Sequence, residues 1–358
     1  MVMQEKPGIR QTYILERGEY NLKGAKVSAT TPEVLADFSK YPKNRIGLAQ
    51  WLMAKENPLM ARVTVNRIWQ MVFGIGLVKT TEDFGVQGDK PSHPELLDWL
   101  AVDFRENGWD MHKLLKKMVL SATYRQSSKV SNQGNDPDNR FLSHGPRFRL
   151  QAEFIRDQAL HLAGHLNQKV GGPSVYPYQP EGLWKGLSNR PRFGMVYRQA
   201  SGDKLYRKSL YTVWKRAYPN PTMTTFDAPG RDVCSVKRAR TNTPLQALAL
   251  LHGPVFVEAS RIMADKALRN RGGLDNSQLI AKLFKKVLIR QANSAEIEIL
   301  LKVFEKKKVI FSKNDKLLKA QLAVGDYKHQ SGLNQVDLAS LTTVCQVLLN
   351  LSETITRN

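Results

Sequence analysis

Residues 207–251 read RKSLYTVWKRAYPNPTMTTFDAPGRDVCSVKRARTNTPLQALALL, and the rest of the chain is organised around this stretch. Its first part, residues 209–217, mixes branched and aromatic side chains with lysine and arginine. That mixture favours β-structure, because such side chains suit a half-buried pleated surface. Pro219-Asn220-Pro221 then stops any regular element, since proline lacks the N–H and restricts the residue before it. Residues 226–230 (FDAPG) form a second break.

The end of the same stretch predicts where a helix begins. Thr243 is a favourable N-cap, Pro244 suits the first helical position, and Gln246 completes a Thr-x-x-Gln capping box. Between residues 207 and 240 there are eight Lys/Arg against two acids, Asp227 and Asp232. A basic loop therefore runs onto a helix N-terminus, whose free N–H groups favour anions.

The loop is therefore a candidate anion-binding surface. Its candidate residues are Arg207, Arg216, Arg231, Arg238, Arg240, Thr241, Asn242 and Thr243. The structural interpretation, which we favour for this loop, is that the arginines pair with Asp227, Asp232 and loop carbonyls, and only fix irregular backbone. Asp227 is also the single weak candidate for a catalytic acid or base, with Asp232 as the second carboxylate.

Composition places the chain among globular proteins with a strong basic bias. It has 358 residues, 42% of them hydrophobic, and a formal net charge of +22. Residues 1–150 contribute +6 and residues 151–358 contribute +16. Such a balance favours partners that are polyanions.

We find no transmembrane segment and no signal peptide. Cys234 and Cys345 form no metal or haem motif, and a disulfide between them stays open.

Hydrophobic periodicity predicts a mainly α, multi-helical fold with a small β contribution and long irregular loops. We expect helices to start near Asn44, Asn57, Asp110, Pro254 and Asn293, another helix over residues 152–166, and another over about 338–351. Ser92 and Glu95 indicate a further capping box. Trp51, Trp69 and Trp99 fall at apolar positions of these helices and are expected in the core.

Four regions follow from this pattern. Residues 1–40 are a tail or the remnant of an upstream domain, with a short strand and a hairpin-like turn. Residues 41–130 are a helical subdomain, 131–273 a central helical and loop region with the basic loop, and 274–358 a set of C-terminal helices. The Ser/Asn/Asp-rich residues 126–138 would be an exposed boundary.

Motifs of known chemistry are mostly absent. His161 and His165 have the i, i+4 spacing of metal ligands, but they lack the glutamate of HExxH and a third ligand, so ordinary histidines are expected. Asp83-Phe84-Gly85 lacks every other kinase signature. There is no GxSxG, no Walker loop and no CxxCH. We therefore predict no haem, no metal and no other cofactor in this chain.

Several phrases, taken in order, carry a family resemblance. They are NRIWQ (66–70), FGIGLV (73–78), EDFG (82–85), HPELLDWL (93–100), SATYRQ (121–126), FDAP (226–229) and TNTPLQAL (241–248). With them, the chain closely resembles the planctomycete-type C-terminal domain of unknown function (domain of unknown function 1553) from about Tyr41 onward. It departs from that pattern at Met71 and Val72, and at His252-Gly253-Pro254.

The resemblance implies a module at the end of a larger exported protein, in the periplasm or cell envelope, with haem on a separate cytochrome-c-like domain. It implies no reaction. The leading hypothesis is a binding or assembly domain for that cytochrome-like neighbour or for an acidic surface polysaccharide. One alternative is an enzyme on an anionic polysaccharide, with Asp227 as acid or base. Another is nucleic-acid binding without sequence specificity, on charge alone.

Overall fold

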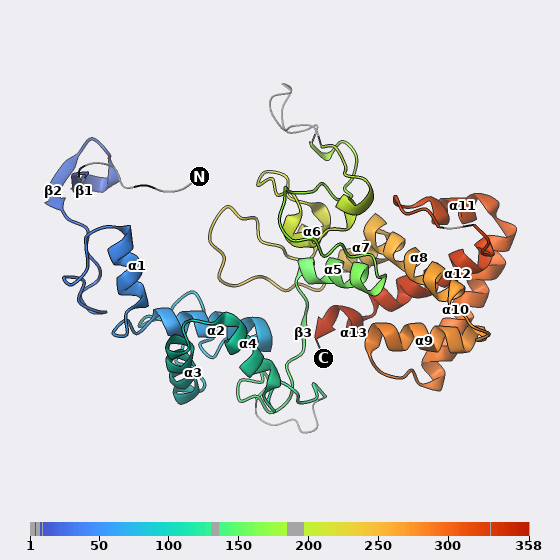
Figure 1. The fold of residues 1–358 in the computed structure, drawn as a ribbon, viewed down its shortest axis with the longest axis horizontal. Coiled ribbons are helices and arrows are strands. Elements are labelled where there is room, and N and C mark those ends of the chain that lie inside the picture. Colours follow the sequence, from blue (N-terminus) through green and yellow to red (C-terminus); the bar gives the residue numbers. More distant parts are fainter. Residues whose placement is uncertain are drawn as a thin grey trace. The chain divides into compact units, whose positions relative to one another are not determined.

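The computed structural model describes residues 4, 8, 10–129, 136–184, 197–329 and 331–357. It divides the chain into two compact units, Met1–Arg125 and Gln126–Asn358. In the described part, helices dominate and the strands form only two small two-stranded sheets, so the predicted mainly α fold is confirmed (Figure 1).

In its described residues, the N-terminal unit joins a hairpin to four α-helices. Its elements are β1 (Thr12–Leu15), β2 (Lys23–Val27), α1 (Arg45–Met53), α2 (Met60–Phe73), α3 (Pro94–Glu106) and α4 (Met111–Leu120). β1 and β2 pair antiparallel, which confirms the predicted hairpin. α2 packs on α3 and α4, and Val65, Leu100 and Leu114 are buried between them.

Most of the helix starts in this unit are where local capping predicts them. Asn44 caps α1 by accepting from the Gly47 N–H at 2.9 Å, and Asp110 caps α4 in the same manner. The helix expected near Ser92 begins at Pro94, which confirms its position, but Ser92 is not its N-cap. His93 is the N-cap of α3, and Ser92 Oγ lies 3.0 Å from its Nδ1 atom instead.

One of the three tryptophans expected in the core lies at the surface. Trp51 and Trp69 are buried, as expected, but Trp99 lies on the outer face of α3 and is 55% exposed. The Lys117 ammonium stands 4.6 Å from the centre of its ring. Leu97, Leu100 and Phe104 form the apolar stripe of α3 that packs against the core. Trp99 lies outside this stripe, so its side chain faces solvent.

The C-terminal unit holds nine helices among its described residues. Its elements are β3 (Phe148–Arg149), α5 (Ala152–Leu162), α6 (Pro221–Thr225), α7 (Pro244–His252), α8 (Pro254–Arg269), α9 (Asn276–Leu288), α10 (Ser294–Lys313), α11 (Asp315–Ala323), α12 (Gln335–Asn350), α13 (Ser352–Ile355) and β4 (Thr356–Arg357). α12 lies along α8 and α10 (Figure 1), where Ile262, Val344 and Leu348 are completely buried. β3 pairs with β4, so the chain end closes on the segment before α5.

An ion-pair network links three helical segments at the surface of this unit. Arg290, at the end of α9, pairs with Glu296 on α10 and Glu353 on α13, each at 2.7 Å. The guanidinium lowers the pKa of both carboxyl groups by hydrogen bonding.

Cys345 is buried in α12 and Cys234 is exposed; both are free thiols, so the disulfide left open by the sequence is not present.

The β-structure expected over residues 209–217 is wrong. Ser209–Tyr211 is a short 3-10 turn, and Thr212 makes only an isolated bridge with Val175. The reason is that two side chains of α5 form hydrogen bonds with backbone N–H and C=O groups that a strand would use to pair with its neighbour. The Asp157 carboxylate accepts the Ser209 N–H at 2.9 Å, and Arg156 donates to the Arg207 carbonyl at 2.9 Å. α5 itself ends at Leu162, four residues early, because Gly164 adopts a positive φ of 62°.

Candidate anion-binding surface

The basic loop, residues 227–243, connects α6 to α7 as a long irregular excursion (Figure 1). Its two ends are held together at one point, which we call the neck. Arg149, from β3, donates to the Asp227 carboxylate, and its Nε atom donates to the Thr241 carbonyl at 3.2 Å. Asp227 in turn accepts from the Thr241 N–H at 2.8 Å and from its hydroxyl at 3.0 Å. The neck therefore ties residues 14 positions apart.

The chemistry of the neck is that of a largely buried ion pair. The Arg149 and Asp227 side chains are only 9% and 15% exposed. Burial lowers the pKa of Arg149, and the Asp227 carboxylate opposes that shift. Asp227 adopts a φ of 60°, in the left-handed region that aspartate tolerates better than most residues. Asp227 is thus fully engaged in closing the loop.

Beyond the neck, the loop exposes cations. The Arg231 guanidinium lies 4.3 Å from the centre of the Trp214 ring, and Trp214 Nε1 donates to the Gly230 carbonyl at 3.1 Å. Lys237 is exposed and has no ion-pair partner among the described residues. Val233 and Cys234 between them are also exposed. The tip of the loop is therefore open to solvent and carries positive charge.

Arg216 adds a further cation to this surface. Its Nε atom lies 3.8 Å from the Asp232 carboxylate, and the two side chains are 71% and 65% exposed. A pair at that distance and exposure contributes little stability, because water screens it. Asp232 is the only acid from residue 228 to residue 243.

Arg238 and Arg240 return toward the helices. Arg238 donates to the Glu153 carboxylate of α5 at 2.7 Å, and Arg240 lies 4.4 Å above the Phe148 ring. Partial desolvation, together with the nearby Arg149 charge, lowers the pKa of Arg240. These two arginines therefore have structural contacts of the kind the structural interpretation expected, and the partner of Arg238 is Glu153.

The remaining candidates separate in space. Arg207 is buried, stacks on the Tyr211 ring at 3.6 Å, and donates to the Pro173, Lys169 and Gly171 carbonyls. It fixes the 169–173 segment and is not part of the loop surface. Thr243 is the N-cap of α7 and forms the predicted capping box with Gln246, which is confirmed. Asn242 beside it is exposed.

The two candidate acid/base carboxylates have different surroundings. Asp227 lies in the neck, and Asp232 lies on the exposed loop beside Arg216. Among the described residues, no group of three or more His, Cys, Asp and Glu side chains is placed to hold a metal ion. His161 is exposed, while His165 packs edge-on against the Tyr206 and Tyr327 rings. The absence of a cofactor in this chain stays a prediction.

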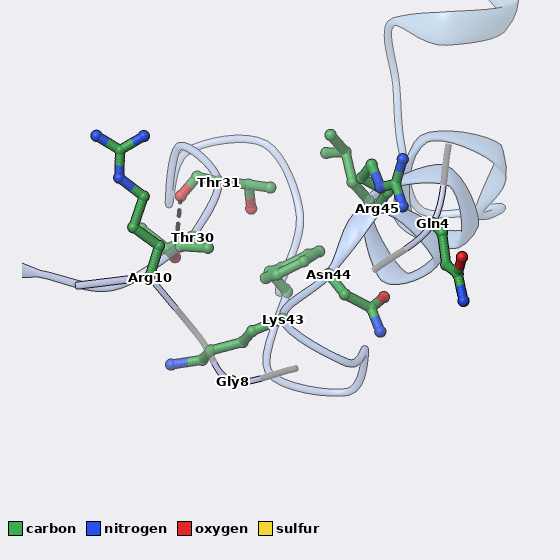
Figure 2. A pocket seen from close by; sticks show the side chains of 11 residues that line it. Gln4, Gly8, Arg10, Thr30, Thr31, Lys43, Asn44 and Arg45 are labelled. Carbon is green, nitrogen blue, oxygen red and sulfur yellow. Dashed lines mark hydrogen bonds between the residues drawn. The ribbon is translucent and has the colours of Figure 1, made fainter. Parts of the chain in front are cut away.

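The N-terminal unit has a different basic feature, a pocket of about 810 Å3. Arg10, Lys43 and Arg45 line it together with Thr30 and Thr31. Figure 2 shows Arg10 and Arg45 on opposite sides of the pocket, with the Lys43 side chain extending toward the Arg10 side. Because the charged ends do not converge, the pocket offers no compact site for one anion.

Sequence reasoning missed the residues that organise this surface. Arg149 closes the neck, Phe148 and Trp214 carry the stacked arginines, and Glu153 pairs with Arg238. The alternation Arg147-Phe148-Arg149 is the one local signal that could have pointed to them. Their partners lie between 16 and 92 residues away in the chain, so no spacing rule reveals them.

The fold and the surface define a mainly helical, strongly basic domain with a closed basic loop. Residues 44–304 match the family PSD1, described as "Protein of unknown function (DUF1553)", and the chain belongs to this family, as its motifs indicated. Comparisons with curated proteins and with solved structures gave no match. In the described residues, no single helix has the length and apolar character to cross a membrane. α7 and α8 pass that test only as a pair bent by 50°.

Proposed function

We propose that this chain is a binding module of a larger exported protein and holds an acidic polysaccharide through its basic loop. The observation that carries the proposal is the closed neck, from which a solvent-exposed loop presents Arg231 and Lys237 beside Arg216. A pre-closed loop loses less conformational entropy when it binds than a free one. Flexible acidic chains suit such an open, cationic surface better than a small substrate does.

The charge balance supports the same class of partner. The segment from residue 228 to residue 243 has four cationic residues and one acid, Asp232. Arg231 also presents a guanidinium stacked on Trp214, an arrangement that keeps a planar donor fork in place for carboxylate or sulfate oxygens. An acidic face on a cytochrome-like neighbour would meet the same cations.

The test compares heparin binding by three forms of the chain over a range of salt concentrations. The loop variant carries Arg216→Gln, Arg231→Gln and Lys237→Gln. The control carries Lys282→Gln, Lys285→Gln and Lys306→Gln, which removes the same charge from exposed positions of α9 and α10. Melting curves on all three forms confirm that they fold.

We expect the loop variant to flatten the slope of log affinity against log salt by up to about three, since each lost contact removes about one unit. The control should keep the slope of the unmodified chain. Equal flattening in both variants would show that heparin is attracted only by the net charge of the protein. That result would refute binding through the loop. Tighter binding to single-stranded DNA than to heparin would move the function to nucleic acid.

A further inference from the structure

A second pocket, of about 300 Å3, lies in the C-terminal unit and is not part of the loop surface. α6, the junction of α7 with α8, and residues 177–180 form its walls. Its size is at the lower end of pockets that bind small molecules. It is therefore suited to one ring-sized group and not to a long segment of a chain.

The apolar part of the wall is made of rings. Pro177, Pro180, Pro221 and Pro254 line the pocket with the side chain of Tyr178. The planar tyrosine ring and the compact proline rings can pack against the C–H face of another ring through many weak dispersion contacts. Because proline rings have almost no rotamer freedom, they lose little entropy when a ligand binds.

Tyr178 is held rigidly by buried partners. Its hydroxyl donates to Glu258 Oε2 at 3.0 Å and accepts from the Asp326 N–H at 2.8 Å. Glu258 is completely buried on α8, and it also accepts from the Tyr206 hydroxyl and the Tyr327 N–H. A buried carboxylate needs such donors, and here they fix the tyrosine ring at the pocket wall. Glu258 is thus a positioning residue.

The polar part of the wall is rich in hydrogen-bond donors. Arg156 lines the pocket and is buried, with its guanidinium held by the Leu205 carbonyl at 2.6 Å and the Arg207 carbonyl at 2.9 Å. Val255 is the second residue of α8, so its N–H has no acceptor within the helix. The amide of Gln179 adds a further donor, and none of the described residues that line the pocket is acidic.

These features select for a carboxylate. Arg156 is a buried cation, and a buried charge favours an opposite charge beside it. Burial lowers its pKa, and the Asp157 carboxylate at 3.4 Å opposes that shift. The beginning of α8 likewise favours an anion. A ring that bears a carboxylate would place its apolar face on the prolines and its charge toward Arg156 and Val255.

The pocket is connected to the neck of the basic loop. Thr225, which lines the pocket, has its carbonyl bound by Gln246 Nε2 at 2.9 Å. The same amide group contacts the Thr241 hydroxyl at 3.1 Å, and Thr241 belongs to the neck. The pocket and the neck therefore share one hydrogen-bond network, which runs through the buried Gln246 side chain.

We propose that the pocket binds a single uronic acid residue, a six-membered sugar ring with one carboxylate. The assignment rests on the proposed function, because it takes the ring to be a unit of the acidic polymer. The pocket itself binds the ring through Arg156, Gln179 and the first turn of α8, with Tyr178 and the prolines under its apolar face. The loop cations are not needed for that contact.

The experiment measures binding of methyl glucuronide, methyl glucoside and benzoate to the full chain by titration calorimetry or ligand-observed NMR. We expect methyl glucuronide to bind with a Kd on the order of 1 mM. It should bind about tenfold more tightly than the neutral glucoside, since a hydrogen bond to a charged group has about that effect. If methyl glucoside bound as tightly as methyl glucuronide, the carboxylate would have no role in binding. If benzoate bound as tightly as methyl glucuronide, the pocket would not be specific for a sugar ring.

Two variants test the location. Ala249→Leu fills the pocket from α7, and Ala247→Leu adds the same side chain at an exposed position of that helix as the matched control. Ala249→Leu should abolish glucuronide binding, and Ala247→Leu should preserve it. Gln179→Leu, at the rim, should weaken binding several-fold and provides a test if Ala249→Leu fails to fold. Unchanged affinity in Gln179→Leu and in a folded Ala249→Leu would overturn the site.

The loop variant separates this proposal from the proposed function. Arg216→Gln/Arg231→Gln/Lys237→Gln should leave methyl glucuronide binding unchanged while it weakens heparin binding. If heparin binding fails in every form but glucuronide still binds, the polymer hypothesis is wrong and the pocket stands. If no form binds glucuronide up to about 50 mM, far above the expected Kd, the pocket is wrong whatever the loop does.

Discussion

Replacing Asp227 with asparagine tests whether the neck is structural. Asparagine has the shape of aspartate and tolerates the φ of 60° at this position, so the change removes charge and little else. Losing one partner of a fully buried ion pair costs about 3–5 kcal/mol, and an exposed pair contributes less than about 1 kcal/mol. With side chains 9% and 15% exposed, the Arg149–Asp227 pair lies near the buried limit. We expect Asp227→Asn to lower the free energy of unfolding by about 2–3 kcal/mol.

The assay is urea unfolding, analysed as a double-mutant cycle with Arg149→Met. For a unit of this size, the loss corresponds to a fall of roughly 2–4 °C in melting temperature per kcal/mol. The double variant should lose less than the sum of the single variants, with a coupling of about 1–3 kcal/mol. Arg149 also donates to the Phe226 and Thr241 carbonyls, so the cycle is needed to isolate the ion pair.

Two results would contradict this reasoning. A loss below about 0.5 kcal/mol for Asp227→Asn would place the cost within the range of ordinary surface substitutions. A coupling near zero would show that the two charges do not interact. The enzyme alternative makes the opposite prediction, namely unchanged stability with loss of a hydrolytic activity on an anionic polysaccharide.

Four further predictions can be checked on the same purified protein. Thr243→Ala should lower the free energy of unfolding by about 1 kcal/mol, because it removes the N-cap of α7; no change in a urea titration would contradict the cap. Cys234 should react with Ellman's reagent in the native protein, while Cys345, whose pKa burial raises to about 12, should react only after denaturation. Arg290→Met should cost about 1 kcal/mol at pH 7 and nearly nothing near pH 3. The two glutamates paired with Arg290 have lowered pKa values, so their contribution is present above the unfolded pKa near 4.3 and is lost as pH falls through the folded values. The visible spectrum should lack a Soret band and metal analysis should find no stoichiometric zinc; either signal would overturn the predicted absence of a cofactor.

The sequence by itself determined the helices. Asn44, Asp110, Thr243 and Asn293 each cap a helix where their residue type predicts it. These signals succeed because the cap and its N–H partner are at most three residues apart. A local contact of that kind forms in the same way whatever the rest of the chain does.

The tertiary structure alone decided which cations face solvent. Arg207 and Arg231 look equivalent in the sequence, yet Arg207 is buried under carbonyls 34 to 38 residues away and Arg231 is exposed on Trp214. In the same way, Asp227 lies in the neck because Arg149, 78 residues earlier, meets it there. A charged side chain is stable when buried only if distant groups supply its hydrogen bonds, and those groups come together only when the chain folds.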